Sequence, residues 1–350
     1  MEIVLIKIKK KKRGEIMKVT MITGDGIGKE ISQSVMDIID ASGANLTWDI
    51  VHAGEAVYEE TGSLIPVKVF TSLEQNKVAL KAPMTTPIGK GFHSVNVALR
   101  KKYDLYANIR PIQSIGTMET LFKQLDLVLF RENTEDLYAG MEEKVTDDEM
   151  RSIKIITRDA SERIIRRAFE YAQENHRSSV TVVTKANIMK LSDGLFLDIA
   201  REIANEFPTI EFKEILVDNM AMQLVIDPYQ FDVVVTENLY GDILSDEMAG
   251  LIGGLGLVPG ANVGDDMAIF EAVHGSAPDI AGKNLANPTA IILGGCMMLD
   301  YLGKTKESHN IRYALDIVLS QPENFTHDLK GTASTSQFTQ AVIKQVQQLN

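Results

Sequence analysis

Short β-rich runs alternate with helix-periodic runs along this chain, and this alternation limits the fold more than any other feature. The β-rich runs end in polar or glycine residues, as strands do; they are KVTMI (18–22), DLVLFREN (126–133), SVTVVTKAN (179–187) and FDVVVTENLYG (231–241). Residues 161–175, between two of these runs, carry apolar side chains at helical spacing: Ile164, Ile165, Ala168, Phe169 and Ala172. The alternation predicts an α/β fold with an at least partly parallel sheet.

Composition excludes several classes of protein. The 350 residues carry a formal net charge of −12, which argues against a generic nucleic-acid binder but leaves room for a locally basic site that takes an anionic substrate. Cys296 is the only cysteine, so no internal disulfide forms and a reducing compartment is expected. No apolar run approaches the roughly 18 residues that span a bilayer, so we expect no membrane partner.

The first 16 residues, MEIVLIKIKKKKRGEI, differ from the rest of the chain. Their apolar residues precede the basic ones, which is the reverse of a secretory signal. We expect a disordered extension or a misassigned start, since Met17 begins the first convincing strand. A nucleic-acid role for the lysine run and a mitochondrial transit segment are the alternatives.

A glycine turn, TGDGIGKE (23–30), follows the first strand-like run and precedes an amphipathic segment. It resembles a dinucleotide-binding loop, but the third glycine of that fingerprint is replaced by Lys29. We therefore expect a tight turn that lets backbone pass close to another segment, and no Rossmann phosphate loop. The glycine-rich run at 249–260 indicates either close helix packing with a connection or a hinge.

Arg100, Arg110 and Arg131 lie near predicted strand ends. Each alone is typical of a surface. Together, in an acidic chain, they favour an anionic substrate, because arginine binds carboxylates through a planar fork. Such sites lie at the carboxyl ends of strands in α/β folds.

Several further side chains are candidates for catalysis or metal binding, although each residue type is also common on a protein surface. Asp242 and Asp246 are four residues apart, so on a helix they share one face, either as solvated acids or as ligands of Mg²⁺ or Mn²⁺. Asp218 lies among apolar residues, where a lone acid would be costly. Lys185 is either a base with a perturbed pKa or a strand-end surface lysine. Tyr138 is a candidate proton donor, since its reference pKa is about 10.

Taken together and in this order, GDGIGKE, SVNVALRKKYDLYANIRP, RENTEDLYAG, KANIMK, NLYGDILSD and HGSAPDIAGKNLANPTA closely resemble the metal-dependent β-decarboxylating dehydrogenases. This is the family of isocitrate, isopropylmalate and homoisocitrate dehydrogenases, and the match runs from about Met17 to the C-terminus. The resemblance implies an isopropylmalate-dehydrogenase-like fold of two α/β domains with a cleft between them, not a Rossmann fold. It implies a large cofactor-binding domain (17–105 and 260–350) and a small domain (106–259) with the metal site and a dimer-forming arm (about 137–157).

The resemblance also implies a substrate. Arg100, Arg110 and Arg131 would bind the malate part that the family's substrates share. Ser94 and Asn96 would bind the remaining group; as hydrogen-bond donors they suit a third carboxylate, which points to isocitrate. An alkyl group there would leave these donors unpaired, a discrimination that can reach roughly 10⁴-fold. Homoisocitrate, one methylene longer, is harder to separate, and isopropylmalate is the other alternative.

By the same resemblance the cofactor is NAD. Asp279 would accept hydrogen bonds from ribose hydroxyls and repel the 2′-phosphate of NADP, and NADP-preferring bacterial relatives usually have a basic and aromatic pair at Asp279 and Ile280. NADP use is the alternative. The implied cofactor-binding residues are Thr85, Thr86, Asn187, Glu271, His274, Gly275, Ala277, Asp279, Ile280 and Asn287.

The implied reaction is oxidative decarboxylation of isocitrate to 2-oxoglutarate and CO₂, in the tricarboxylic acid cycle. Asp218, Asp242 and Asp246 would hold Mg²⁺ or Mn²⁺, Lys185 would be the base and Tyr138 the proton donor. In this family Lys185 and Asp218 come from the neighbouring protomer, so we expect a homodimer or higher oligomer with shared sites. A non-catalytic regulatory chain is the alternative of a different class. The expected location is the cytoplasm, or the mitochondrial matrix in a eukaryote.

Overall fold

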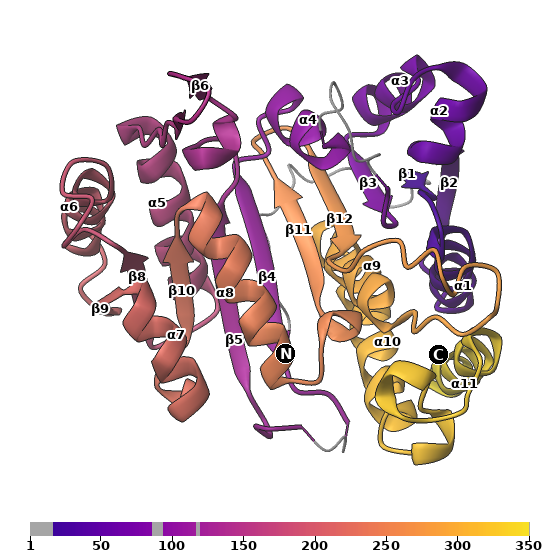
Figure 1. Cartoon of the computed structure of the whole chain (residues 1–350). Helices are drawn as coiled ribbons and strands as arrows, with labels where there is room; N and C mark the ends of the chain where they lie inside the picture. Colours follow the sequence, from indigo (N-terminus) through magenta and orange to yellow (C-terminus); the bar gives the residue numbers. More distant parts are fainter. Residues whose placement is uncertain (1–16, 86–93, 117–119, 350) are drawn as a thin grey trace.

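The computed structural model describes residues 17–85, 94–116 and 120–349. The extension predicted for residues 1–16 lies outside them, as does Thr86. Figure 1 shows a broad twisted sheet with helices packed against it. No helix in the described part of the chain is long and apolar enough to cross a membrane.

Ten strands of the described chain form one sheet in the order β2-β1-β3-β12-β11-β4-β5-β10-β8-β9. Their bounds are β1 (Met17–Ile22), β2 (Leu46–Val51), β3 (Val78–Lys81), β4 (Ala107–Gln113), β5 (Asp126–Glu132), β8 (Ser179–Thr184), β9 (Glu211–Leu216), β10 (Val233–Thr236), β11 (Pro259–Val263) and β12 (Ala268–Ala272). β11 runs antiparallel to β12 and β4, and β4 runs antiparallel to β5; the other neighbours are parallel. The predicted α/β class with a partly parallel sheet is confirmed.

Helices connect most of these strands. They are α1 (Gly28–Ala41), α2 (Glu55–Thr61), α3 (Val67–Asn76), α4 (Val95–Lys102), α5 (Arg158–Glu174), α6 (Ser192–Ala204), α7 (Val217–Ile226), α8 (Asn238–Leu251), α9 (Thr289–Tyr301), α10 (Thr305–Val318) and α11 (Thr335–Leu349). Short 3-10 turns are η1 (Asp136–Ala139), η2 (Pro228–Gln230), η3 (Leu255–Leu257), η4 (Pro322–Asn324) and η5 (His327–Leu329). The helix predicted over 161–175 is α5, and it begins where the Thr157 side chain accepts a hydrogen bond from the Ala160 N–H.

Burial explains why the inner strands read as continuous apolar runs. β3, β8 and β10 are buried at every residue, so both of their faces are covered, as in other parallel sheets. α9 is buried at all but one of its residues and packs on β12, β3 and β11. α5, in contrast, buries one face only, as its apolar periodicity indicated.

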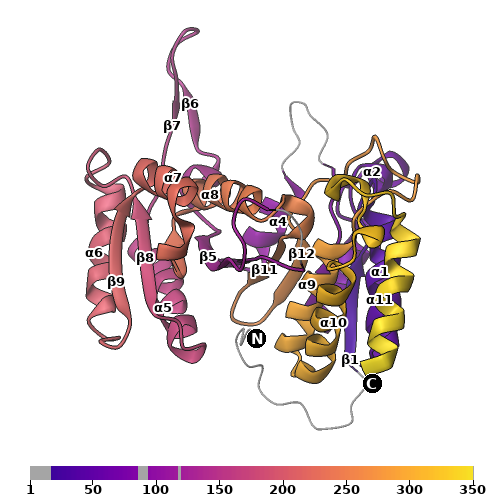
Figure 2. The same cartoon turned by 90° about the horizontal axis from the view of Figure 1, so that it is seen from below.

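The sheet runs without a break across the boundary predicted between the two domains. β11, from the predicted large domain, pairs with β4, from the predicted small domain, through Ala261–Ile109, Asn262–Asn108 and Val263–Ala107. One core cluster also holds residues from both parts, for example Val19 and Val180. Figure 2 shows α5 and α6 at one end of the sheet and α1, α10 and α11 at the other, with β5 and β11 between them. The two-domain division stays a prediction, and the strands at its boundary form the middle of one sheet.

A two-stranded antiparallel hairpin, β6 (Glu142–Lys144) and β7 (Met150–Ser152), lies within the predicted arm. Every residue of both strands is exposed. Figure 2 shows the hairpin projecting from the body of the chain beyond α7 and α8. A projecting, exposed hairpin fits the predicted arm, and its dimer-forming role stays a prediction.

Candidate active site

The three arginines predicted to bind a carboxylic acid meet in the middle of the sheet. Arg110 lies on β4, Arg131 on β5 and Arg100 in the last turn of α4. Arg131 pairs across the strands with Asn108, two residues before Arg110, so both arginines leave the same face of the sheet. The exposed fractions are 8% for Arg100, 4% for Arg110 and 1% for Arg131. The structure therefore brings the predicted arginines together and buries them.

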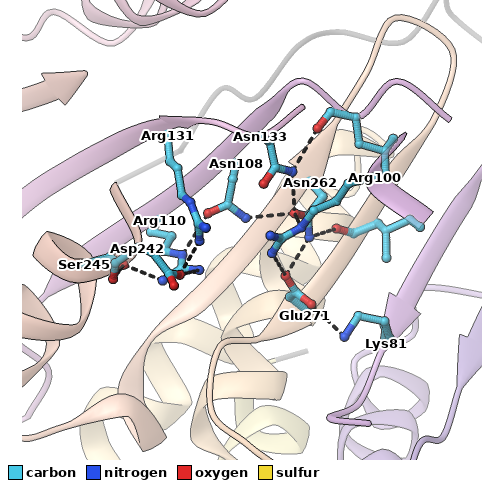
Figure 3. A network of polar contacts seen from close by, with 12 residues as sticks. Lys81, Arg100, Asn108, Arg110, Arg131, Asn133, Asp242, Ser245, Asn262 and Glu271 are labelled. Carbon is cyan, nitrogen blue, oxygen red and sulfur yellow. Dashed lines mark hydrogen bonds and ion pairs between the residues drawn. The ribbon is translucent and has the colours of Figure 1, made fainter. Parts of the chain in front are cut away.

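Each guanidinium is held through its Nε by a neutral amide, as Figure 3 shows for two of them. The Nε donors and side-chain oxygen acceptors are Arg100 with Asn262 (3.1 Å), Arg110 with Asn108 (2.8 Å) and Arg131 with Asn238 (3.0 Å). Gly241 makes room for the stem of Arg131, because a Cβ at this position would lie 2.5 Å from its Cγ. An amide oxygen fixes a guanidinium without adding negative charge, so the nearby anions within the described residues are Asp242, Asp246 and Glu271 alone.

The electrostatics of this cluster favour an anion. Burial lowers the pKa of Arg100, and burial with the neighbouring charges of Arg131 and Arg100 lowers the pKa of Arg110 to about 10. With a pKa of about 10, the Arg110 side chain is still a cation at neutral pH. Arg131 Nη2 is buried and has no hydrogen-bond partner among the described residues. A buried cationic donor without a partner is costly, and a bound carboxylate would relieve that cost.

Tyr138 and Asp242 adjoin the arginines. The Tyr138 hydroxyl donates to Asp242 Oδ2, and Arg131 Nη1 donates to Asp242 Oδ1. Burial and the Asp242 charge raise the pKa of Tyr138, so the phenol stays protonated. Burial opposes ionisation of Asp242, but Arg131 and the Tyr138 hydroxyl outweigh it and lower the pKa of that carboxyl. The Asp136 carboxylate accepts from the Leu239 N–H at 2.7 Å, which joins η1 to the first turn of α8.

Asp242 and Asp246 lie on α8, one turn apart, as the spacing predicted. Arg110 approaches both carboxylates, with a nitrogen–oxygen distance of 3.7 Å to each. Burial raises the pKa of Asp246, which disfavours its anion in the absence of a cation. Two hard oxygen donors on one helix face fit Mg²⁺ or Mn²⁺. Within the described ranges, however, no three acidic, histidine or cysteine side chains lie close enough to hold a metal ion.

The third predicted metal ligand lies elsewhere in the chain. Asp218, at the start of α7, accepts from Lys185 Nζ at 2.5 Å, and this lysine follows the end of β8. The hydrogen bond from Lys185, and to a smaller extent its charge, lowers the pKa of Asp218. The apolar neighbours of Asp218 suggested a buried acid, but 66% of its side chain is exposed in the single chain. Asn187 is also exposed. The predicted residues thus form two groups, one around Arg131 and one around Lys185.

A buried charged cluster that the sequence analysis missed supports the Lys185 group. Lys154 Nζ lies 2.6 Å from Asp193 Oδ1 and 2.6 Å from Glu237 Oε2, and the two acids are 0% and 1% exposed. Asp193 Oδ2 accepts from the Lys185 backbone N–H at 2.7 Å and from the Tyr240 hydroxyl at 3.1 Å. Burial and the neighbouring charge of Asp193 raise the pKa of Glu237 to about 8. The single ammonium of Lys154 does not compensate for them, because it is shared between two buried carboxylates.

Ser94 and Asn96 lie at the beginning of α4, one turn before Arg100. Asn96 Oδ1 is buried and without a hydrogen-bond partner in the part of the chain that the structure describes. Asn96 also lines a small pocket with Lys81, Arg100, Asn262 and Glu271. The predicted specificity residues are therefore next to the arginine cluster.

Most residues predicted to bind the cofactor lie in the loop after β12. His274 Nε2 is buried and unpartnered within the described residues, and burial lowers the pKa of this imidazole. Gly275 and Asp279 are exposed, whereas Ala277 and Ile280 are half-buried. Asn287, nearer α9, donates to Asp328 at 3.0 Å. Thr85 joins this loop through a 2.6 Å hydrogen bond between its hydroxyl and that of Ser276.

Glu271 differs from the other predicted cofactor residues, since it is 5% exposed and pairs with Lys81 Nζ at 2.7 Å. Burial opposes its ionisation, but Lys81 and Arg100 outweigh it and lower the pKa of Glu271 to about 2. In the single chain this carboxylate supports Arg100, whose Nη2 lies 3.6 Å away.

The glycine turn uses its own N–H groups within the protein. Gly24 and Gly26 have φ of +63° and +55°. The N–H groups of Asp25 and Ile27 donate to the carbonyls of Pro83 and Ser276, each at 2.9 Å. A Cβ at Gly24 would lie 2.0 Å from the Pro83 oxygen. Amides occupied by carbonyls cannot bind a phosphate, which explains physically why this turn is not a phosphate loop.

Only Arg131 lies near a strand end as predicted, because Arg110 is in the middle of β4 and Arg100 is on α4. Beside the carboxylates of α8, this buried cluster suits a small polycarboxylic acid. A model of the isocitrate/isopropylmalate dehydrogenase family matches residues 18–342, and the chain belongs to this family. The family and fold predicted from the sequence are confirmed.

Individual relatives agree with the family match. The chain is 50% identical over 333 residues to a mitochondrial regulatory subunit of isocitrate dehydrogenase [NAD] from Dictyostelium discoideum, covering 95% of this chain and 92% of that one. It is 48% identical over 339 residues to the alpha subunit of human mitochondrial isocitrate dehydrogenase [NAD], covering 96% of this chain and 92% of that one. The crystal structure of isocitrate dehydrogenase from Methylococcus capsulatus superposes with a TM-score of 0.92, at 48% identity, covering 95% of this chain and 100% of that one.

Proposed function

We propose that this chain catalyses the oxidative decarboxylation of isocitrate to 2-oxoglutarate and CO₂ with reduction of NAD, a step of the tricarboxylic acid cycle. The observation that carries the proposal is the cluster of three buried, charged arginines, each held by a neutral amide. The names of relatives at 48% and 50% identity, NAD-dependent isocitrate dehydrogenase subunits, support the substrate and the cofactor.

Arg100, Arg110 and Arg131 bind the substrate carboxylates in this proposal, and Arg131 Nη2 is the donor that lacks a partner among the described residues of the single chain. Ser94 and Asn96 bind the carboxylate that distinguishes isocitrate from an alkyl-substituted relative. Because the guanidinium groups are already fixed through Nε, binding costs little side-chain ordering.

Asp242 and Asp246 are the ligands that this part of the chain offers to Mg²⁺ or Mn²⁺, with Asp218 of a second copy as the third. A divalent cation there would stabilise the negative charge that develops on the substrate oxygen during hydride loss and decarboxylation. Arg131 and Arg110 pair with these carboxylates in the single chain, so a cation there would compete with them for the same oxygens.

Lys185 of a second copy takes the proton of the C2 hydroxyl, and Tyr138 gives a proton to C3 after CO₂ leaves. Tyr138 suits this role because its pKa is raised and its hydroxyl is held by Asp242. NAD supplies the acceptor for the hydride that leaves C2. Its binding residues are Thr85, Thr86, Asn187, Glu271, His274, Gly275, Ala277, Asp279, Ile280 and Asn287.

The active site is shared between two copies of the chain. Apolar side chains on α7 and α8 support this, since Met222, Val225, Ile226 and Ile243 are 50–63% exposed. Leu191, near Lys185, is 90% exposed. Exposed apolar groups around a predicted catalytic lysine indicate a surface that another chain covers. A stable monomer with full activity would contradict the shared site.

The decisive experiment measures kcat/KM of the purified single chain for isocitrate, homoisocitrate and isopropylmalate, with Mn²⁺ and either NAD or NADP. Isocitrate with NAD should give the highest value. A higher value for another acid would replace the proposed substrate, and a higher value with NADP would replace the proposed cofactor.

A regulatory chain is the second candidate, because one relative at 50% identity carries that description in its name. The chain nevertheless keeps Tyr138, Lys185, Asp218, Asp242 and Asp246. Turnover by the single chain would exclude this candidate, whereas activity that appears only on mixing with a different polypeptide would favour it. The relatives' names support a mitochondrial location if the source is a eukaryote, and the cytoplasm is proposed otherwise.

The role of Tyr138 has a separate test. Tyr138→Phe should slow overall decarboxylation more than it slows reduction of added oxalosuccinate, because only the first process needs a proton at C3. Equal losses in the two assays would count against this role.

A further inference from the structure

Asn262 lies at the centre of the polar network in Figure 3. It is on β11, 3% exposed, and pairs across the strands with Asn108 on β4. Its Oδ1 accepts three hydrogen bonds: from Arg100 Nε at 3.1 Å, from Asn108 Nδ2 at 2.9 Å and from Asn133 Nδ2 at 3.1 Å. The sequence analysis assigned no role to this residue.

The amide of Asn262 has one orientation that satisfies its neighbours. Its Nδ2 donates to Glu271 Oε1 at 2.6 Å and to the Ile269 carbonyl at 3.4 Å. The opposite orientation would place Nδ2 against three donor groups and Oδ1 against a carboxylate. Because Glu271 is held in turn by Lys81 Nζ at 2.7 Å, the acceptor presented to Arg100 is fixed.

The hydrogen bonds continue from Asn262 to a second arginine. Asn108 donates to Asn262 and accepts from Arg110 Nε at 2.8 Å. An unbroken series of hydrogen bonds therefore runs from α4 through β11 to β4, by way of Arg100, Asn262, Asn108 and Arg110. This series of hydrogen bonds crosses the strand pair that joins the two predicted domains. It therefore fixes Arg100 of the predicted large domain relative to Arg110 of the predicted small domain.

A neutral residue suits this position. A carboxylate there would lie beside the buried anion of Glu271, and the two charges would repel. An apolar residue would leave the Nε of Arg100 and two amide groups without their acceptor.

We propose that Asn262 is a positioning residue that sets the placement of Arg100 relative to Arg110, and so controls affinity for a substrate whose carboxylates bind to both. Asn262 acts through Arg100 and Asn108, to which it is hydrogen-bonded. This inference rests on the proposed function, from which it takes the role of the arginines.

The test begins with wild-type turnover of isocitrate, which decides the proposed function separately. Asn262→Ala should then raise KM for isocitrate by about 10-fold to 100-fold, as expected for loss of a hydrogen bond to a charged group. The kcat value should change less than about threefold, and KM for NAD should rise less than KM for isocitrate, because Lys81 still holds Glu271. Asn205→Ala, which removes an exposed amide at the end of α6, is the matched control and should change neither. An equal rise of both KM values would mean a general structural defect and would overturn the proposal.

A double-variant cycle with Arg100→Lys distinguishes positioning from independent damage. If Asn262 acts through Arg100, the double variant should lose at most about threefold more than Arg100→Lys alone. If the loss in the double variant equals the product of the losses in the two single variants, the proposal is overturned. If Asn262→Ala does not fold, Asn262→Ser, whose hydroxyl can accept one of the three hydrogen bonds, takes its place in the same cycle. If the wild type prefers another of the three acids, the proposed substrate is wrong, and the double-variant cycle is run with that acid instead. A wild type that turns over none of the three acids overturns both the proposed function and the role of Asn262.

Discussion

Replacing Lys154 by methionine should destabilise the chain strongly and in a pH-dependent way. Lys154 is the cation that lies 2.6 Å from both Asp193 and Glu237, which are 0% and 1% exposed. Its ammonium also lies 4.6 Å from the ring centroid of Tyr240. Methionine keeps most of the side-chain volume but leaves two buried carboxylates without a counter-charge.

The magnitude follows from these contacts. Removing one partner of a buried ion pair costs about 3–5 kcal/mol, because the remaining charge is not compensated. A typical folded protein is stable by about 5–15 kcal/mol, so this loss is a large fraction of the total. Lys144→Met is the matched control, since Lys144 forms an exposed pair with Asp147 and should lose no more than about 0.5 kcal/mol.

The pH dependence of this loss of stability tests whether ionisation of Glu237 contributes to it. The folded-state pKa of Glu237, about 8, is above the unfolded value, so the folded state holds this proton more tightly. Stability from Glu237 is therefore fully present below the unfolded pKa of about 4.3 and is lost as the pH rises through 8. Without the ammonium, ionisation of Glu237 becomes still less favourable, so the loss in Lys154→Met should be larger at pH 8.5 than at pH 5.5.

Urea unfolding followed by far-ultraviolet circular dichroism at the two pH values measures these differences. Lys154→Met/Glu237→Gln should recover part of the loss at pH 8.5, because only one buried carboxylate remains. A loss below about 1 kcal/mol, or an equal loss at both pH values, would refute the account of this cluster.

Three further predictions concern the glycine turn, the metal and the cofactor. Gly24→Ala should lower the free energy of unfolding by about 2 kcal/mol more than Gly43→Ala, since both glycines have positive φ but only Gly24 would place a Cβ against backbone; equal effects in urea unfolding would contradict the clash. Asp246→Asn should raise the Mg²⁺ concentration for half-maximal activity by about tenfold, and the exposed Asp147→Asn should leave it unchanged; an unchanged metal requirement in Asp246→Asn would remove it from the ligand set. Asp279→Lys should raise kcat/KM with NADP relative to NAD by about tenfold, because it replaces a charge that repels the 2′-phosphate by one that attracts it; an unchanged ratio would place the discrimination elsewhere.

The sequence predicted those parts of the fold whose signal is local. The apolar periodicity of α5 and the β-rich runs of β1, β5, β8 and β10 were sufficient, because each element is set by neighbours a few residues away. The pairing of β11 with β4 was not predicted. It joins residues about 150 positions apart, and no local pattern records which strand edges meet.

The candidate site also contains residues that the local sequence could predict and residues that it could not. The one-turn spacing of Asp242 and Asp246 could be predicted, because helix geometry alone places them on one face. Asn262, Lys154 and Asp193 were missed, because residues of these types at such positions are commonly on the surface. They are an asparagine in GANV, a lysine after the hairpin and an aspartate in the first turn of a helix. Their burial among distant partners gives them their importance, and burial of a polar residue depends on the complete tertiary structure.

The continuous sheet also limits how the chain can move. β4 and β11 join its two ends through paired backbone hydrogen bonds, so these ends are not connected by covalent linkers alone. Any change in the angle between them must be taken up as a change in strand twist, spread over several strands, or must break hydrogen bonds that are out of contact with water. A change in the angle between the two ends therefore costs free energy, which the contacts of a bound ligand would have to supply.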